Sequence, residues 1–255
     1  MLRRIKTLRG NPLAAQDGEI GQVHDFLFDD SSWNIRYVVA DTSQWLPGRK
    51  VLLRPPCIVR SLSSDYKDVP VPVELTRDQI KESPDIDTEK PVSRQQEAHL
   101  HQYFAWPFYW TPSGQLNSPI IAAPTSPADV RDVPLENQDK DDDDDPHLRS
   151  DRKVEGYTIE ATDGKLGHIE DMIVDDEAWK IRYLIVDTKN WLPGKKVLVA
   201  TGPAIGDFNS IDRSLSLQLN RETIKSAPAY EGSEPIERDY EVRLHNYYGL
   251  TGYWE

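Results

Sequence analysis

The chain has 255 residues, of which 38% are hydrophobic and 29% charged, and its formal net charge is −13. This length accommodates two domains, each able to bury a core. The acidic balance disfavours binding to nucleic-acid phosphates or to anionic membranes. No apolar run approaches the roughly 20 residues of a membrane span, and no apolar core follows the basic residues 3–4. These features predict a cytoplasmic protein.

The first half of the chain predicts a series of short strands. Asp17-Gly18, flanked by apolar alternation, is a typical hairpin turn, and residues 20–28 follow it as an extended segment. Residues 35–41 are rich in β-branched and aromatic side chains and predict the next strand. A turn at residues 46–48 leads into a strand that starts at residues 51–53. Two more short strands are predicted at residues 57–59 and 71–75.

Cys57, in the first of these two segments, is the single cysteine of the chain. It has no partner for an internal disulfide, and it excludes a multi-cysteine metal site. Its apolar neighbours predict a buried structural thiol rather than a nucleophile.

Two helices are predicted to follow the strands in this half. Thr76 is a favourable N-cap for a short helix over residues 77–83. Residues 97–104 predict a second helix, in which Leu100, Tyr103 and Phe104 form one apolar face that must be covered. The face is expected to pack on a β-barrel, and the sequence leaves open whether on its own or on its twin.

The whole pattern recurs about 146 residues later. Residues 17–53 match residues 163–199 without a gap, with about half the positions identical. The second copy therefore predicts the same strands, a strand over residues 214–219, a helix over residues 221–227 capped by Asn220, and a tail helix over residues 241–248. The chain is thus predicted to be mainly β, with two tandem small β-barrels, each ending in a short helical tail.

The two copies are separated by residues 111–150, which are rich in proline and aspartate. This composition is typical of a solvated connection, and consecutive aspartates such as Asp141 to Asp145 are the wrong pattern for a Ca²⁺ loop. The predicted organisation is one repeat at residues 1–110, an acidic linker at 111–150 and a second repeat at 151–255. A linker of about 40 residues lets the two repeats pair with each other.

The order of turns, strands and aromatic tail resembles the PRC-barrel family, which includes the cytoplasmic domain of the photosynthetic reaction-centre H subunit and the C-terminal domain of a ribosome maturation factor. The resemblance rests on the following residues and their counterparts in the second copy: Asp17, Gly18, Gly21, Asp25, Asp29, Asp30, Ile35, Arg36, Tyr37, Asp41 and Trp45-Leu46-Pro47-Gly48. It implies six-stranded barrels that act as docking surfaces without catalytic residues. The chain lacks the membrane helix of the first relative and the N-terminal domain of the second.

Candidate catalytic groups are few. The acids Asp25/Asp171 and Asp41/Asp187 recur in both copies. They admit two interpretations, paired carboxylates in a cleft or hydrogen bonding to backbone amides and to Arg36/Arg182, and the second is favoured. No catalytic residue, cofactor or metal site is predicted. Trp33/Trp179 are expected in the core or between the barrels.

The leading hypothesis is a non-enzymatic, soluble adaptor that docks a protein partner of unknown identity. Candidate contact residues are those of the Trp-Leu-Pro loops and of the tails, since rigid aromatic anchors dominate interfaces: Trp45, Leu46, Pro47, Trp191, Leu192, Pro193, His101, Tyr103, His245 and Tyr247. His101/His245 are expected to be ordinary packed histidines, with a pH-sensitive contact as the alternative. The sequence also leaves open a ribosome-assembly or RNA-processing factor that docks on a ribosomal protein, a peripheral component of a photosynthetic complex, and an uncharacterised hydrolase or isomerase.

Overall fold

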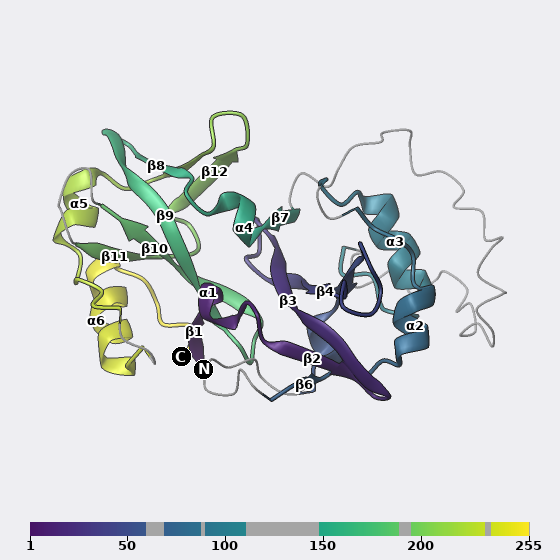
Figure 1. The fold of residues 1–255 in the computed structure, drawn as a ribbon. Helices are drawn as coiled ribbons and strands as arrows, with labels where there is room; N and C mark the ends of the chain where they lie inside the picture. Colours follow the sequence, from purple (N-terminus) through teal and green to yellow (C-terminus); the bar gives the residue numbers. More distant parts are fainter. Residues whose placement is uncertain (60–68, 88–89, 111–147, 189–194, 233–235, 255) are drawn as a thin grey trace, which may run out of the picture.

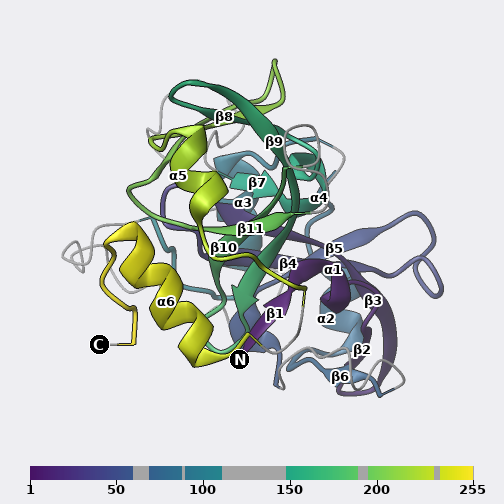
Figure 2. The same cartoon turned by 90° about the vertical axis from the view of Figure 1, so that its left-hand side faces the viewer.

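The computed structural model describes residues 1–59, 69–87, 90–110, 148–188, 195–232 and 236–254. It contains two β-sheets that lie next to each other, with helices at the two outer ends of the molecule (Figure 1). The view at right angles shows the first strand of the chain alongside the sheet of the second repeat (Figure 2). The chain is therefore mainly β, as the sequence predicts.

The first repeat supplies most strands of one sheet, in the order β5-β4-β3-β2-β6. Its elements are β2 (Pro12–Ala15), β3 (Gly18–Asp29), β4 (Ile35–Asp41), β5 (Lys50–Leu53), the 3₁₀ turn η1 (Pro55–Cys57), β6 (Val71–Pro72), α2 (Arg77–Glu82) and α3 (Arg94–Tyr103).

The second repeat supplies the other sheet, in the order β11-β10-β9-β8-β13-β12. Its elements are β8 (Thr158–Ala161), β9 (Gly164–Asp175), β10 (Lys180–Asp187), β11 (Lys196–Ala200), β12 (Ile205–Asn209), β13 (Ser214–Leu217), α5 (Arg221–Ser226) and α6 (Arg238–Tyr248). Among the described pairings neither order closes on itself, so the structure shows two sheets and does not confirm the predicted closed barrels.

Most predicted elements are confirmed. The turn at Asp17 joins β2 to β3, and β4 spans the predicted residues 35–41. Thr76 caps α2 by accepting from the Gln79 amide, and Asn220 caps α5 in the same way.

Two predicted strands in the first repeat differ from the structure. Residues 57–59 do not form a strand, because Pro55 and Pro56 favour a 3₁₀ turn and cannot donate to a ladder. Only Ile58 makes an isolated bridge, to Val73. The strand predicted at residues 71–75 is reduced to β6, which contains a proline. Cys57 is buried and reduced, as predicted.

Each repeat gives one strand to the sheet of the other. Strand β1 (Leu2–Arg4) pairs antiparallel with β9, and β7 (Leu148–Ser150) pairs antiparallel with β3. The registers are equivalent, because Leu2 lies opposite Asp175 and Leu148 opposite Asp29. Helices α1 (Ile5–Leu8) and α4 (Asp151–Val154) continue these strands and pack on β9 and β3. The last three residues of the range predicted as linker are thus part of a sheet.

A second reciprocal contact joins the turns that precede β4 and β10. The Ile35 amide donates to Trp179 O (2.7 Å), and the Ile181 amide donates to Trp33 O (2.8 Å). Trp33 is buried against Phe208 of the second repeat, with 5.8 Å between ring centroids. Equivalent residues therefore meet across a pseudo-twofold axis, and Trp33 lies between the repeats as expected.

The main apolar core is continuous across both repeats. It includes Phe26 and Val38 from the first and Met172 and Leu184 from the second. Two smaller clusters lie beneath the tails, and each contains one exchanged leucine: Leu148 beside Tyr37 and Leu2 beside Tyr183. Burial of shared apolar surface is the main force that holds the two repeats together.

Candidate interaction surface

Each tail helix packs on its own repeat. Leu100 of α3 lies in a cluster with Tyr37, Val39 and Leu52. Leu244 of α6 lies in the equivalent cluster of the second repeat. This answers the question that the sequence left open about the aromatic face of the tails.

A buried hydrogen-bond network fixes the first tail to β4. The Tyr37 hydroxyl donates to Glu97 Oε1 (2.7 Å) and also lies 2.7 Å from His101 Nε2. Tyr109, beyond the helix, donates to the same Glu97 oxygen (2.7 Å). The second repeat reproduces the whole arrangement with Tyr183, Glu241, His245 and Tyr253.

The partners of His101 determine its protonation. Nδ1 lies 3.0 Å from the Pro107 carbonyl oxygen, which can only accept, so a neutral ring is assigned its proton on Nδ1. Nε2 is then an acceptor, and the single proton of Tyr37 faces both Nε2 and Glu97. Burial and, secondarily, the charge of Arg54 lower the pKa of His101 to about 4, so the ring is neutral at pH 7.

Acidification is expected to destabilise the first repeat through His101. Its pKa is about 4 in the folded chain, against an ordinary value of 6.5, so the unfolded chain binds the extra proton between these values. Stability is therefore lost as the pH falls from 6.5 to 4, by about 3 kcal/mol. Urea unfolding of wild type and His101→Gln across this range measures the difference.

The exposed neighbour His99 provides the control, because His99→Gln should keep the wild-type pH slope. An unchanged slope in His101→Gln would show that this ring does not titrate as the structure implies.

Arginine side chains stack on the aromatic ends of both tails. The Arg36 guanidinium lies 4.0 Å from the Tyr109 ring centroid, and that of Arg94 lies 4.3 Å from Trp110. We call these four residues together with the exposed Phe108 the first tail surface. The second tail surface consists of the equivalent residues Arg182, Arg238, Tyr253 and Trp254. The Arg182 guanidinium lies 3.8 Å from the Tyr253 ring centroid, and that of Arg238 lies 4.3 Å from Trp254.

The Trp-Leu-Pro loop of the first repeat lies apart from this surface. Trp45 is half-buried, donates from Nε1 to Ile20 O (2.9 Å) and carries Arg77 over its ring at 4.4 Å. Leu46 is half-buried and Pro47 is exposed. Trp191, Leu192 and Pro193 of the second loop lie outside the described residues, as do Asp141 to Asp145.

The tail residues named as candidate contacts differ in exposure. His101 and His245 are buried, so they hold the tails from inside and are not exposed to a partner. Tyr103 is partly exposed and donates to Gln79 O (3.0 Å), whereas Tyr247 is 38% exposed and donates to Thr223 O. Only the two tyrosines therefore remain available at the surface.

The arginines of the tail surfaces were not among the residues predicted for contact. Arg36 binds Asp29 (3.0 Å) rather than the acids proposed for it, and Arg182 binds Asp175 (2.9 Å). The sequence contains a signal that could have identified these arginines, because each of them recurs with its aromatic partner in both copies. The predicted bonding of Asp25 and Asp171 to amides is confirmed at Phe26 and Met172, both at 2.8 Å.

Metal-binding clusters and membrane-spanning helices are two further features that a functional site could involve. Within the described ranges, no three His, Cys, Asp or Glu side chains gather as metal ligands would. None of the helices described there combines the length and apolar character required to cross a membrane.

Comparison with known proteins supports the family resemblance. Residues 146–218 match the family model of the PRC-barrel domain. A search of curated proteins found no match. The matched segment runs from β7 to β13, so it includes the strand that the second repeat gives to the first. Residues 146–218 in the second repeat therefore match the PRC-barrel domain, which is consistent with a PRC-barrel family protein.

Proposed function

We propose that this protein is a non-enzymatic adaptor that binds protein partners through its two tail surfaces. The observation that carries the proposal is the duplication of an Arg–Tyr–Trp cluster, held in place by a buried network, on both repeats. Arginine, tyrosine and tryptophan are the residues most enriched among interface hot spots. Domains of this family suggest an interaction module, which agrees with the proposal.

The fixed position of the tail surfaces favours binding. Tyr109 and Tyr253 are each anchored by a hydrogen bond to a buried glutamate, so their rings are ordered before a partner arrives. Pre-ordered anchors lose little conformational entropy on binding. Because the two repeats are joined by exchanged strands, the two surfaces keep a constant relative position, which suits a partner with two matching sites.

We further propose that each repeat forms the small barrel typical of the family. In the first repeat the exchanged strand β7 is then one of six strands, together with β2 to β6. A cytoplasmic location is part of the same proposal and rests on the composition of the chain.

The test is capture of partners by crosslinking in the native host, followed by mass spectrometry. Trp110→Ala with Trp254→Ala removes one aromatic ring from each tail surface and is expected to abolish capture. Trp45→Ala with Trp191→Ala examines the loops separately. Ile211→Ser is the control, because Ile211 is an apolar residue that is 94% exposed on another part of the molecule.

The proposal fails if the tail variant captures the same proteins as wild type, or if wild type captures nothing above background. The identity of the partner separates the possible roles. Ribosomal proteins would favour a ribosome-assembly role, and photosynthetic membrane proteins would favour a peripheral role in that complex.

A further inference from the structure

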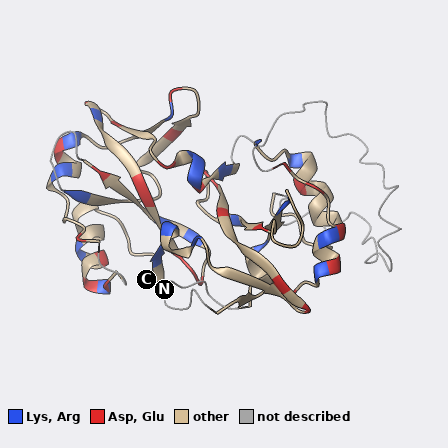
Figure 3. Ribbon diagram, viewed as in Figure 1, with Lys and Arg blue, Asp and Glu red and all other residues tan. Residues whose placement is uncertain are grey.

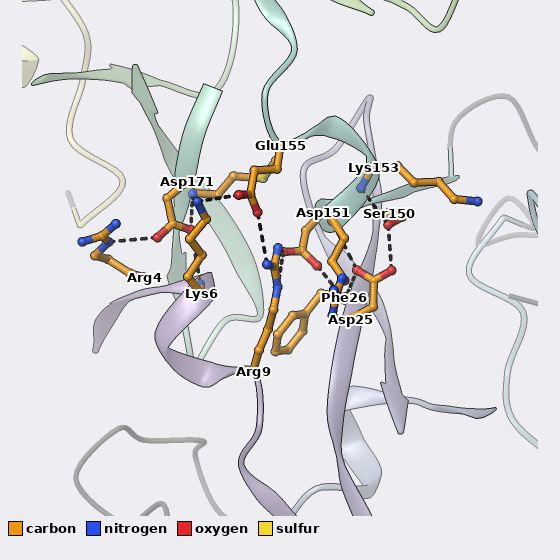
Figure 4. Close-up of polar contacts among 12 residues, drawn as sticks. Arg4, Lys6, Arg9, Asp25, Phe26, Ser150, Asp151, Lys153, Glu155 and Asp171 are labelled. Carbon is orange, nitrogen blue, oxygen red and sulfur yellow. Dashed lines mark hydrogen bonds and ion pairs between the residues drawn. The ribbon is translucent and has the colours of Figure 1, made fainter. Parts of the chain in front are cut away.

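The junction between the repeats contains a polar cluster in which equivalent positions carry different residues. Arg9 and Glu155 are equivalent, as are Ile5 and Asp151. Figure 4 shows Arg9 between Asp151 and Glu155. Arg9 Nε lies 3.1 Å from Asp151 Oδ2, and its Nη1 lies 3.1 Å from Glu155 Oε2. The first repeat thus supplies the cation and the second supplies both acids.

Asp151 is the most deeply placed acid of this cluster. It is 2% exposed, accepts the Phe26 amide (2.9 Å) and hydrogen-bonds the Asp25 carboxyl group. Burial and the charge of Asp25 raise the pKa of Asp151, and Arg9 opposes this effect. A buried acid beside a second acid is costly unless a cation compensates. Arg9 of the other repeat is the cation that binds Asp151.

Several contacts of the exchanged strands are common to both repeats. Arg4 is an exception, because it binds Asp171 (2.9 Å), whereas the equivalent Ser150 donates to Asp25 (2.7 Å). Arg3 binds Asp176 (2.9 Å), and the equivalent Arg149 binds Asp30 (2.7 Å). Leu2 and Leu148 occupy equivalent apolar clusters. Taken alone, the contacts that both repeats share would allow each repeat to exchange its strand with a copy of itself.

The cluster of Arg9, Asp151 and Glu155 disfavours strand exchange between identical repeats. If two copies of the second repeat paired, Glu155 would occupy the position of Arg9, and each Asp151 would face acids without its arginine. Arg152, which is equivalent to Lys6, would still supply a cation near Glu155 but not the one that Asp151 needs. If two copies of the first repeat paired, each Arg9 would face Ile5 and the other Arg9. Basic segments of α1 and α4 lie between the sheets, beside the acidic segment of β9 (Figure 3).

We propose that Arg9, Asp151 and Glu155 make the strand exchange heterotypic, so that the exchange surface of each repeat accepts the other repeat and rejects a copy of itself. This is specificity by electrostatic mismatch of the wrong pairs, added to contacts that all pairs share. It concerns the junction and is independent of what the tail surfaces bind.

The test uses the full chain with a protease site introduced between residues 111 and 147. Two isotopically distinct batches are folded intact, cleaved, mixed, unfolded in urea and refolded together, and the species are weighed by native mass spectrometry. Wild-type halves are expected to form mostly unlike pairs, each of a first with a second repeat. Like pairs, of two identical repeats, should stay below about one tenth of the total. Abundant like pairs would overturn the proposal.

Glu155→Arg is the decisive variant. In a pair of two second repeats, this variant places an arginine opposite Asp151, so the amount of such pairs is expected to rise at least tenfold. In the unlike pair, the same variant removes the contact between Arg9 and Glu155. Arg149→Gln is the matched control, because it weakens a contact common to all pairs and should leave their ratio unchanged. No increase in like pairs with Glu155→Arg would refute the assignment.

A second measurement avoids cleavage altogether. In the intact chain Arg9→Gln is expected to lower the urea midpoint, and adding Asp151→Asn should recover most of the loss, because the neutral amide no longer needs the cation. Equal midpoints for Arg9→Gln and wild type would also contradict the proposal.

Discussion

Replacing Gly21 with alanine is expected to destabilise the first repeat severely, although it adds only one methyl group. A Cβ atom at this position would lie 1.8 Å from the Asp41 carbonyl oxygen, and the residue has a φ of +122°. The second repeat has the same close contact, because a Cβ atom at Gly167 would lie 2.0 Å from the Asp187 carbonyl oxygen. Since the opposing atoms belong to the backbone of a paired strand, the ladder itself must move, and we expect a loss of about 3 kcal/mol or more.

Gly10→Ala separates the clash from the backbone strain. Gly10 also has a positive φ, +80°, but nothing lies within 4 Å of its Cβ position, so we expect a loss of about 1 kcal/mol. Urea unfolding of the Gly21→Ala and Gly10→Ala variants gives the comparison. Similar losses for Gly10→Ala and Gly21→Ala would mean that close approach of the two strands does not explain the glycine.

Charged substitutions in the exchanged strands are expected to act on the opposite repeat. Leu2 and Leu148 are each 8% exposed, and each lies in the apolar cluster of the other repeat's sheet. Leu2→Asp should therefore loosen β9, and Leu148→Asp should loosen β3. Burying an unpaired carboxylate in an apolar cluster is expected to cost about 2–4 kcal/mol.

Hydrogen exchange of backbone amides distinguishes the two repeats directly. Leu2→Asp should accelerate exchange in residues 171–175 and leave residues 25–29 close to wild type, and Leu148→Asp should give the reverse pattern. Each variant serves as the control for the other. Acceleration confined to the repeat that carries the substitution would contradict the observed strand exchange.

The local elements were predictable because their causes are local. The Asp17-Gly18 turn, the Thr76 and Asn220 caps and the β-branched strand at residues 35–41 each depend on neighbours within a few positions. The strand predicted at residues 57–59 failed for a reason that was also local, because two prolines precede Cys57. His101 is packed, as expected, but the candidate site was otherwise predicted less well, since the stacking of Arg36 on Tyr109 depends on where the tail packs.

By itself the sequence determined that the chain is a tandem repeat of a β-rich module with an aromatic tail, because turn residues, periodicity and recurrence are properties of short segments. Only the tertiary structure decided which repeat receives each first strand. The edges of β3 and β9 offer equivalent registers and equivalent acids, Asp30 and Asp176, so that the pattern of either repeat fits both edges. The choice between them is made by contacts between residues more than a hundred positions apart, such as Arg9 with Asp151, and these form only when both sheets are already in place.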